Sequence, residues 1–429
     1  MNLTTLDLVI IFGYVAAMVA MGLYFSSRAT RSIDDYFVGG RSLSWWLAGV
    51  SMIASAFAID TPLGITGLVA KNGVKGVWFA WTYILGGAGT FGAFIFASML
   101  RRSNVITAAE LIELRYSGKA AAFLRGFKSL YFGILTTCIS MGWVIRSVLV
   151  VSEEALGWDA MPTLVVLIIL TMTYTTASGL WGVAVTDFVQ FFVGTFGMLS
   201  LAYFSLGSVG GFSGLHEAMG VRYGAEAVER LQFVPRPDSQ FFFTFLVFIS
   251  LKWWGNPPGA LTQRIMSTKD ERHATLATVL FAVVHFAMNY WPMILIALVS
   301  LVTYPELPVD KAERGYAMLL VKVLPPGFLG LSLAAATAAL MSTVDTQINM
   351  GASYMVNDIY RRFLKPKATT KHYVRASQVS TIIMLGLGIT AAMFMDSVQS
   401  AWYYLAMLTA GYGFVVVMRW FWWRVSAWS

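Results

Sequence analysis

The sequence AIDTPLG at residues 58–64 and the sequence GNPPG at residues 255–259 each interrupt a long apolar stretch. Proline and glycine break α-helices, and broken backbone at membrane depth is tolerated only where it is buried in protein or lines a cavity. Counted from the second apolar stretch, the interrupted stretches are the first and the sixth of ten. Each interruption therefore opens a five-helix half, and because five is odd, the second half is inverted. Two proline kinks in an ordinary helix bundle are the alternative, but they do not explain the matched positions.

The composition places the chain in a membrane. Of its 429 residues, 57% are hydrophobic and 12% are charged, which is outside the range of soluble globular proteins. Windows long enough to cross the hydrocarbon lie near 6–26, 43–70, 76–100, 121–151, 161–181, 184–208, 240–262, 274–303, 326–350, 373–395 and 398–423. We therefore predict an all-α polytopic membrane protein with about eleven transmembrane helices. One is an N-terminal helix, and the others form two inverted five-helix repeats with discontinuous first helices.

The same windows predict four segments along the chain. An N-terminal peripheral helix and a cytoplasmic loop occupy 1–42, and the first inverted repeat occupies 43–208. The segment 209–239 is extracytoplasmic and reads as a short amphipathic helix and a turn that shields the site. The second inverted repeat occupies 240–429.

The charge pattern predicts topology rather than nucleic-acid binding. The net charge is +8, but the basic residues lie between apolar spans and form no patch with interleaved aromatics. Most of them, including Arg264, fall in alternate connecting segments, which the positive-inside rule assigns to the cytoplasm. We therefore predict a multi-pass protein of the inner or plasma membrane, in contact with the lipid bilayer and with its N-terminus outside.

The remaining sequence signals exclude several kinds of chemistry. The single cysteine, Cys138, excludes an internal disulfide. The four histidines have no metal-ligand spacing, and His285, which lies deep in a span, is predicted to pack or to contact substrate. The sequence has no G-x-x-x-x-G-K-[ST] phosphate loop, so ATP hydrolysis by that route is not the driving force.

The stretch AALMSTVDTQINMG at residues 338–351 places hydroxyls and a carboxylate inside a long apolar segment. If this stretch is a helix, one of its faces carries Ala339, Ser342, Thr343 and Thr346. Asp345 lies beside that face, and an acid inside the membrane is by default a functional-site hypothesis. The pattern predicts a small-cation site of hydroxyl and carbonyl oxygens. For the hydroxyl residues considered without Asp345, the alternative is that small side chains of this kind pack between helices.

Several local strings together resemble the sodium:solute symporter family. They are DYFVGGRSL at 35–43, TAAE at 107–110, RY at 115–116, YT at 174–175, SGLW at 178–181, TDFVQ at 186–190, WG at 254–255, QR at 263–264, MSTVDT at 341–346 and DIYRR at 358–362. The resemblance spans the chain and implies the five-plus-five inverted-repeat fold of the leucine transporter. Family members carry further helices after the tenth core helix, so we expect this chain to be truncated there.

The resemblance also implies a sodium ion as cofactor. The family's shared site uses backbone carbonyls at the break of core helix one and hydroxyls of core helix eight. By position in the matching strings, the ligands would be Ala54, Phe57, Ala339, Ser342 and Thr343. The residues agree with this, because an unwound helix frees carbonyls that can bind a cation.

Some relatives hold a second sodium between core helices five and eight. Here the resemblance implies that Asp187, Ser342, Asp345 and Thr346 would supply the ligands. A structural ion pair between Asp187 and a cytoplasmic basic residue is the equally weighted alternative.

The implied substrate contacts lie at the two helix breaks and at the start of core helix two. Asp60 lies in the first break, and Ser250, Lys252 and Trp253 lie beside the second. Trp78 and Phe79 open core helix two. Asp60 matches an acidic substrate contact of a sugar carrier of the family, and Trp253 matches its aromatic inner gate. Lys252 would bind a carboxylate, pair with Asp60 or snorkel. Ala56 stands where the family's proline carrier has an acidic residue, which argues against a plain proline carrier.

The predicted function is sodium-coupled secondary active transport, a symport that imports a small polar solute by alternating access without enzymatic chemistry. A membrane sensory module of a signalling protein is one alternative, and proton coupling through Asp60 or Asp187 is another. The sequence does not name the solute, the sodium stoichiometry or the oligomeric state.

Overall fold

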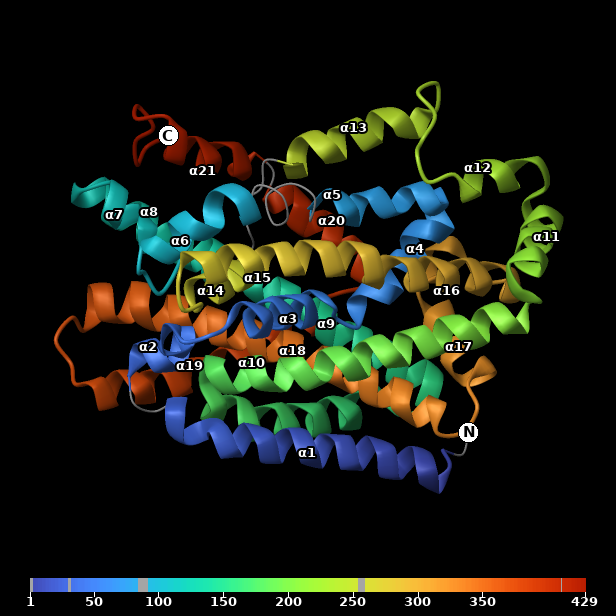
Figure 1. Cartoon of the computed structure of the whole chain (residues 1–429), viewed down its shortest axis with the longest axis horizontal. Coiled ribbons are helices and arrows are strands. Elements are labelled where there is room, and N and C mark those ends of the chain that lie inside the picture. The colour runs from blue at the N-terminus through green and yellow to red at the C-terminus, as the bar shows by residue number, and fades with distance from the viewer. Residues whose placement is uncertain (1–2, 30–31, 84–91, 254–258, 410) are drawn as a thin grey trace.

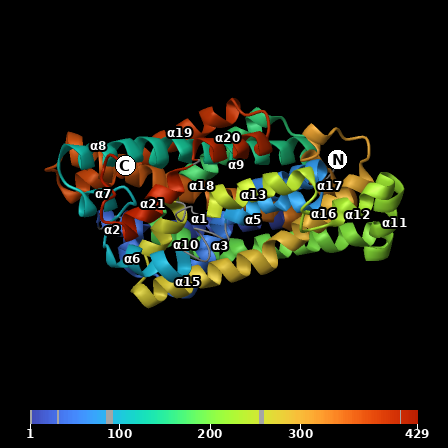
Figure 2. The same ribbon diagram turned by 90° about the horizontal axis from the view of Figure 1, so that it is seen from above.

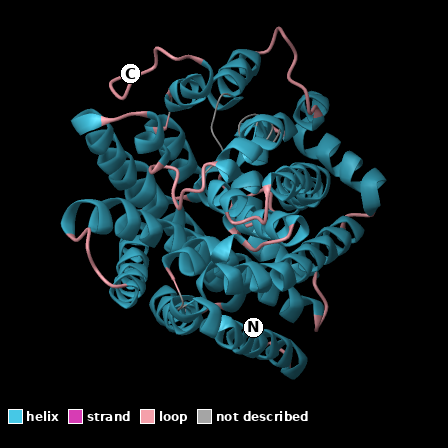
Figure 3. Cartoon of the chain, turned by 60° about the vertical axis from the view of Figure 1, so that its left-hand side comes forward, coloured by secondary structure: helices cyan, strands magenta, loops and turns pink. Residues whose placement is uncertain are grey.

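The computed structural model of the chain describes residues 3–29, 32–83, 92–253, 259–409 and 411–429. Within these ranges the chain is helical, and its one isolated β-bridge joins Leu43 to Thr268. Figure 3 shows helices packed side by side with short loops between them. The expected all-α class is confirmed.

The helices follow one another along the chain. The α-helices are α1 (Thr5–Ala29), α2 (Ile33–Val38), α3 (Trp45–Ala56), α4 (Asp60–Asn72), α5 (Trp78–Tyr83), α6 (Ala97–Arg102), α7 (Leu111–Arg115), α8 (Gly118–Lys128), α9 (Thr136–Val151), α10 (Ala160–Ser208), α11 (Gly211–Tyr223), α12 (Ala227–Leu231), α13 (Gln240–Trp253), α14 (Gly259–Met266), α15 (Glu271–Val284), α16 (Tyr290–Thr303), α17 (Arg314–Val323), α18 (Phe328–Ser353), α19 (Thr370–Met393), α20 (Val398–Leu408) and α21 (Tyr412–Phe421). Wider π-helical turns extend several of them: η4 (Gly92–Phe96), η5 (Ser129–Leu135), η6 (Ser152–Leu156), η8 (His285–Asn289) and η10 (Tyr354–Leu364). Short 3₁₀ turns complete the description: η1 (Gly39–Arg41), η2 (Val74–Val77), η7 (Gly224–Glu226) and η9 (Val309–Lys311).

The described part of the chain holds six helices long and apolar enough to cross a membrane, or up to eight if each bent helix pair is one span. The remaining expected spans, 76–100, 161–181 and 240–262, include residues or side chains outside the description. The polytopic character is therefore confirmed. With each bent pair counted as one span, the described helices give up to eight spans, and the three remaining windows belong to the expected total of about eleven.

The first predicted break is present between α3 and α4. Helix α3 ends at Ala56, α4 begins at Asp60, and the two helices are bent by 51°. The break comes earlier than the AIDTPLG string suggests, because Pro62 lies in the first turn of α4, where its missing N–H costs no helical hydrogen bond. The second predicted break, near Pro257, lies outside the described residues.

Helices α1, α10 and α18 pack against one another along much of their length. Helix α10 changes direction at Gly179, whose φ of 56° is in the left-handed region that favours glycine. The Asp7 carboxylate accepts hydrogen bonds from the N–H groups of Gly327 (2.8 Å) and Gly330 (2.7 Å). Because these are orphan donors at the start of α18, the carboxylate fixes α1 to that helix.

Different helices lie at the two ends of the molecule. In Figures 1 and 2 the N-terminus and α11 lie at the right-hand end, whereas α2 and α7 lie at the left-hand end. The segment 209–239 forms α11, η7 and α12. It is fixed by an ion pair of Lys75 with Glu229 (2.5 Å) and by a hydrogen bond from Arg230 to the Ala70 carbonyl (3.1 Å). This segment therefore packs on the end of α4, and its extracytoplasmic shielding of the site remains a prediction.

Replacing Gly64 with alanine is expected to lower the free energy of unfolding by about 1–3 kcal/mol, because a Cβ there would lie 2.4 Å from the Trp402 ring. The control is Gly386→Ala in α19, where a Cβ meets no atom within 4 Å. That change is expected to leave stability equal or slightly higher. Thermal unfolding of the purified variants in detergent measures the difference. Equal melting temperatures for the two variants would disprove the close packing of α4 on α20.

Candidate functional site

The end of α3 meets the middle of α18. In the last turn of α3 the Ile53 carbonyl accepts from the Phe57 N–H at 2.9 Å, and the carbonyls after it have no amide donor within that helix. The Thr343 hydroxyl of α18 donates to one of them, the Ser55 carbonyl, at 3.4 Å. The hydroxyls of Ser55 and Thr346 lie 3.0 Å apart. The helix break and the hydroxyl-bearing face of α18 therefore share one buried interface.

All five predicted ligands of the first sodium lie at or beside this interface. Ala54 and Phe57 belong to the end of α3 and its break, and both are buried. Ala339, Ser342 and Thr343 are buried on α18. The Ser342 hydroxyl donates to Asp187 Oδ1 at 2.6 Å. The structure thus brings together the two elements named from the sequence and adds a carboxylate to them.

Asp187 of α10 is fully buried and accepts several hydrogen bonds. Its Oδ2 atom accepts from the Ser51 hydroxyl of α3 and lies 3.4 Å from the guanidinium of Arg264. Ser51 and Ser342 therefore bind opposite oxygens of one carboxylate. Asp187 links α3, α10, α14 and α18 at a single point.

The assignment of Arg264 to a cytoplasmic loop is wrong. Its side chain is fully buried. It donates to Thr346 Oγ1 at 2.5 Å and to Ser51 Oγ at 3.1 Å, in addition to Asp187. Burying a guanidinium is costly unless carboxylates and hydroxyls compensate it, and this cluster supplies both. The expected basic partner of Asp187 exists, but it lies in the protein interior.

The residues predicted for a second sodium surround the same guanidinium. Asp345 is fully buried, and its charge acts on Arg264. Asp187 and Thr346 bind Arg264 directly. The oxygens of Asp187 and Thr346 that were predicted to bind a second sodium are therefore already engaged by Arg264.

Asp60 lies at the first break and is buried. Its Oδ2 atom accepts a hydrogen bond from the Trp402 indole N–H at 3.1 Å, and its Oδ1 atom has no partner among the described residues. Phe79 is buried and packs on Tyr403, with ring centroids 4.8 Å apart. Gln399 adds a buried Nε2 without a partner within the described ranges. These α20 residues could not be identified from the sequence, because their aromatic and amide side chains form no motif.

The other predicted substrate contacts are Trp78, Ser250, Lys252 and Trp253, and the structure describes the side chains of the first two. The Trp78 indole N–H donates to the Phe233 carbonyl at 2.8 Å, so its polar atom is engaged by the segment after α12. Ser250 lies in α13 and is exposed. The side chains of Lys252 and Trp253 lie outside the described residues, so the proposed pairing of Lys252 with Asp60 remains a prediction.

His285 is a packing residue. It is buried, its ring stacks on Phe281, and its Nδ1 atom lies 3.0 Å from Asn289 Nδ2. In the part of the chain that the structure describes, no three His, Cys, Asp or Glu side chains are grouped to hold a metal ion.

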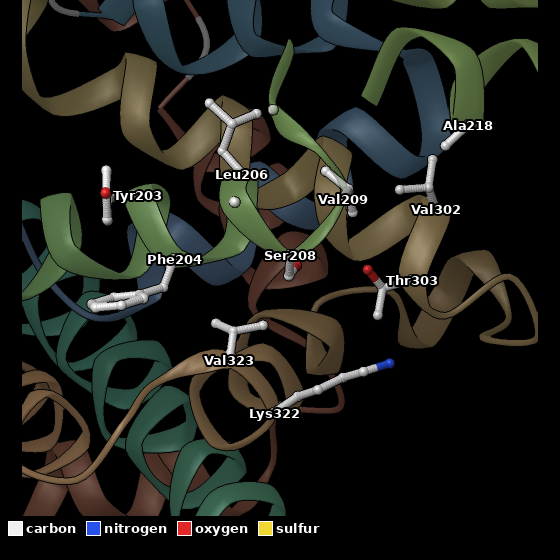
Figure 4. A pocket seen from close by; sticks show the side chains of 12 residues that line it. Tyr203, Phe204, Leu206, Ser208, Val209, Ala218, Val302, Thr303, Lys322 and Val323 are labelled. Carbon is white, nitrogen blue, oxygen red and sulfur yellow. The ribbon is translucent and has the colours of Figure 1, made fainter. Parts of the chain in front are cut away.

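One pocket lies away from all these residues. It has a volume of about 890 Å³ and lies at the end of the molecule that carries α11. Figure 4 shows Tyr203 and Phe204 of α10 on one side of it and Lys322 and Val323 of α17 on another. It contacts none of the predicted sodium or substrate residues.

Comparisons with known proteins agree on one family. The family model of the sodium:solute symporter family matches residues 36–428. The chain is 26% identical over 420 residues to the sodium/mannose cotransporter SLC5A10 of Bos taurus, covering 90% of this chain and 69% of that protein. It is 25% identical over 448 residues to the sodium/glucose cotransporter 2 of Rattus norvegicus, covering 93% of this chain and 66% of that protein. The chain thus spans about two thirds of the length of these relatives.

The fold is also that of a solved transporter. A Na+-coupled sialic acid symporter in a substrate-bound outward-open state matches with a TM-score of 0.81. The match covers 97% of this chain and 86% of that structure at 21% identity, so it establishes the fold. The expected leucine-transporter-type architecture is confirmed. Since the family model matches nearly the whole sequence, the chain belongs to the sodium:solute symporter family, whose members are membrane transporters and not enzymes.

Proposed function

We propose that the chain is the transport core of a sodium-coupled symporter that imports a small polar solute by alternating access. Its repeats would be 43–208 and 240–429, in an inner or plasma membrane with the N-terminus outside. One observation carries the proposal: the hydroxyl face of α18 lies against the last-turn carbonyls of the broken helix α3. The comparisons support sodium coupling over the sensory and proton-coupled alternatives, because the relatives are named sodium cotransporters.

The first sodium would bind at the α3 break. Its ligands would be the carbonyls of Ala54, Phe57 and Ala339 and the hydroxyls of Ser342 and Thr343. Hard cations take oxygen ligands at about 2.3–2.6 Å. The hydrogen bond from Thr343 to the Ser55 carbonyl supports the site, since it shows that a hydroxyl of α18 reaches this row of carbonyls. Because α3 and α18 belong to different repeats, a cation between them would favour one relative position of the halves.

The second sodium would bind near Asp187, Asp345 and Thr346. The buried oxygens of Asp187 and Thr346, which lie around one point, support it. The ion would compete with Arg264 for Asp187 Oδ2 and Thr346 Oγ1, because both oxygens already contact the guanidinium. Arg264 would therefore hold the carboxylate in place when the cation leaves.

The solute would bind beside Asp60. The Oδ1 atom of Asp60 has no partner among the described residues, and this supports the proposal because a buried carboxylate oxygen favours a hydroxyl donor. The nearby rings of Phe79 and Tyr403 offer apolar faces that suit a sugar ring. The relatives named for glucose and mannose also favour a sugar. Ser250, Lys252 and Trp253 beside the second break and Trp78 at the start of α5 remain proposed contacts.

Removing one hydroxyl from the first site removes one buried oxygen ligand of the cation. This change is expected to weaken sodium binding by about 5- to 150-fold. The variants are Ser342→Ala and Thr343→Ala. The measurement is equilibrium binding of ²²Na⁺ to the purified full chain, displaced by unlabelled sodium.

Thr337→Ala is the matched control on the same helix, because the Thr337 hydroxyl bonds the Leu333 carbonyl within α18. It is expected to bind sodium like the parent. If Ser342→Ala and Thr343→Ala both kept the parental affinity, α18 would not be the sodium helix, and Asp187 or Asp60 would become the leading candidate.

A further inference from the structure

Another cavity lies at the end of the molecule that carries α11 and α12 (Figures 1 and 2). Its volume is about 110 Å³, whereas a single water molecule needs roughly 10–15 Å³. The lining includes two arginines, Arg222 of α11 and Arg230 of α12, together with Tyr223, Ser300 and Tyr304. None of the residues that line it was predicted to bind sodium or solute, so the cavity has a role that the transport site does not explain.

The two arginines place their positive charges beside one aromatic ring. The guanidinium carbon of Arg230 lies 4.3 Å from the centroid of the Tyr223 ring, and that of Arg222 lies 5.1 Å from the same centroid. The ring attracts each cation, but two like charges that share one ring also repel each other. A negative charge between them would remove that repulsion.

The Arg222 guanidinium is incompletely hydrogen-bonded. Its Nη2 atom donates to the Pro305 carbonyl at 3.1 Å. Its Nη1 atom is buried and has no hydrogen-bond partner among the described residues. All the nitrogens of a guanidinium are donors, and a buried donor without an acceptor is costly. The Nη1 atom therefore indicates an acceptor that the described chain does not supply.

The acidic side chains near the cavity do not neutralise Arg222. Glu226 lies 3.8 Å from the Arg230 Nε atom, and its side chain is 73% exposed, so water screens its charge. Glu306 is exposed as well. A third cation is close, since Lys322 Nζ lies 5.0 Å from the centroid of the Tyr304 ring, which lines the cavity.

We infer that this cavity binds a small inorganic oxyanion of the phosphate or sulfate class. Arg222 Nη1 and the Arg230 guanidinium would donate charge-assisted hydrogen bonds to different oxygens of the anion. The Ser300 hydroxyl, which belongs to a residue only 2% exposed, would be a third donor. A tetrahedral anion can accept from donors on several sides at once, and the cavity has room for one.

A bound anion would join three parts of the chain. Arg230 already donates to the Ala70 carbonyl near the end of α4, the half-helix that begins at Asp60. Arg222 belongs to α11, and Ser300 belongs to α16. The anion would therefore stabilise the position of α11 and α12 on α4, and by mass action it would raise the melting temperature of the chain.

The test is isothermal titration of sodium sulfate and sodium phosphate into the purified full chain, in sodium gluconate at constant ionic strength. The parent is expected to show one saturable site, and Arg222→Gln to bind roughly 10- to 150-fold more weakly. Arg236→Gln is the matched control, because Arg236 is an exposed arginine of the same segment. It should bind as the parent does.

Arg222→Lys tests whether the charge attracts the ligand. It keeps a positive charge in the cavity and is expected to bind the anion more tightly than Arg222→Gln does. No saturable binding to the parent, as for a cavity that holds water alone, would overturn the inference. Parental affinity in Arg222→Gln, equal loss in Arg236→Gln, or Arg222→Lys no better than Arg222→Gln would also overturn it. Saturable binding of chloride without phosphate or sulfate would contradict the oxyanion class.

Discussion

Arg264→Met is expected to lower the free energy of unfolding by about 3–5 kcal/mol, because it removes one partner of a fully buried ion pair. Asp187 would remain in the interior with Ser51 and Ser342 as its hydroxyl donors. Thr346 Oγ1 would lose its guanidinium donor at the same time. Thermal and denaturant unfolding of the purified chain, monitored by tryptophan fluorescence, measures the loss.

Two comparisons make this result specific. Arg102→Met removes an exposed ion pair with Glu271 and is expected to leave stability nearly unchanged. The double variant Arg264→Met with Asp187→Leu replaces the whole pair with apolar side chains and should recover most of the lost stability. It should still lose the second sodium. An Arg264→Met protein as stable as the Arg102→Met protein would contradict the buried network.

Arg125→Met is also expected to lower the free energy of unfolding by about 3–5 kcal/mol. The Arg125 guanidinium binds Asp358 at 2.6 Å and Glu113 at 2.7 Å. Asp358 is fully buried and also accepts from the Thr107 hydroxyl at 2.6 Å. The guanidinium therefore ties α7, α8 and η10 together at the end of the molecule that carries α2.

The measurement is again equilibrium unfolding, and Lys119→Met at an exposed position of α8 is the control. The double variant Arg125→Met with Asp358→Leu is expected to be more stable than Arg125→Met alone, since no unpaired carboxylate remains buried. If the double variant were less stable than Arg125→Met alone, the assignment of Asp358 as the stranded charge would be wrong.

The same cluster has a pH dependence. Hydrogen bonds from Arg362, followed by those from Arg125, hold the pKa of Glu113 below its ordinary value. A carboxyl group with a lowered folded-state pKa stabilises the protein above its unfolded pKa and loses that contribution as the pH falls through the folded-state pKa. Acidification below that range is therefore expected to loosen α7 first.

The helix break could be predicted because it has a local cause. Pro62 cannot lie in the interior of a helix that continues from α3, so that helix must end before it. The exact boundary could not be predicted, because proline is allowed in the first turn of a new helix. The hydroxyl face of α18 was predictable for the same local reason, since helical spacing alone places Ser342 and Thr343 together.

The Arg264 network could not be predicted from the sequence. A basic residue shortly after an apolar window is usually a topology signal. Its burial depends on Asp187, Thr346 and Ser51, which lie on three other helices. The pairing of Asp60 with Trp402 depends in the same way on tertiary contacts.

The most direct test of the account is solute accumulation by the purified chain in proteoliposomes. Labelled D-glucose, D-mannose and sialic acid are offered under an inward sodium gradient, with choline replacing sodium in the control. The account predicts accumulation of a solute above its external concentration only with sodium, and a half-maximal sodium concentration about 5- to 150-fold higher in Thr343→Ala. Equal accumulation in choline, or accumulation that follows an imposed pH gradient and ignores sodium, would contradict it.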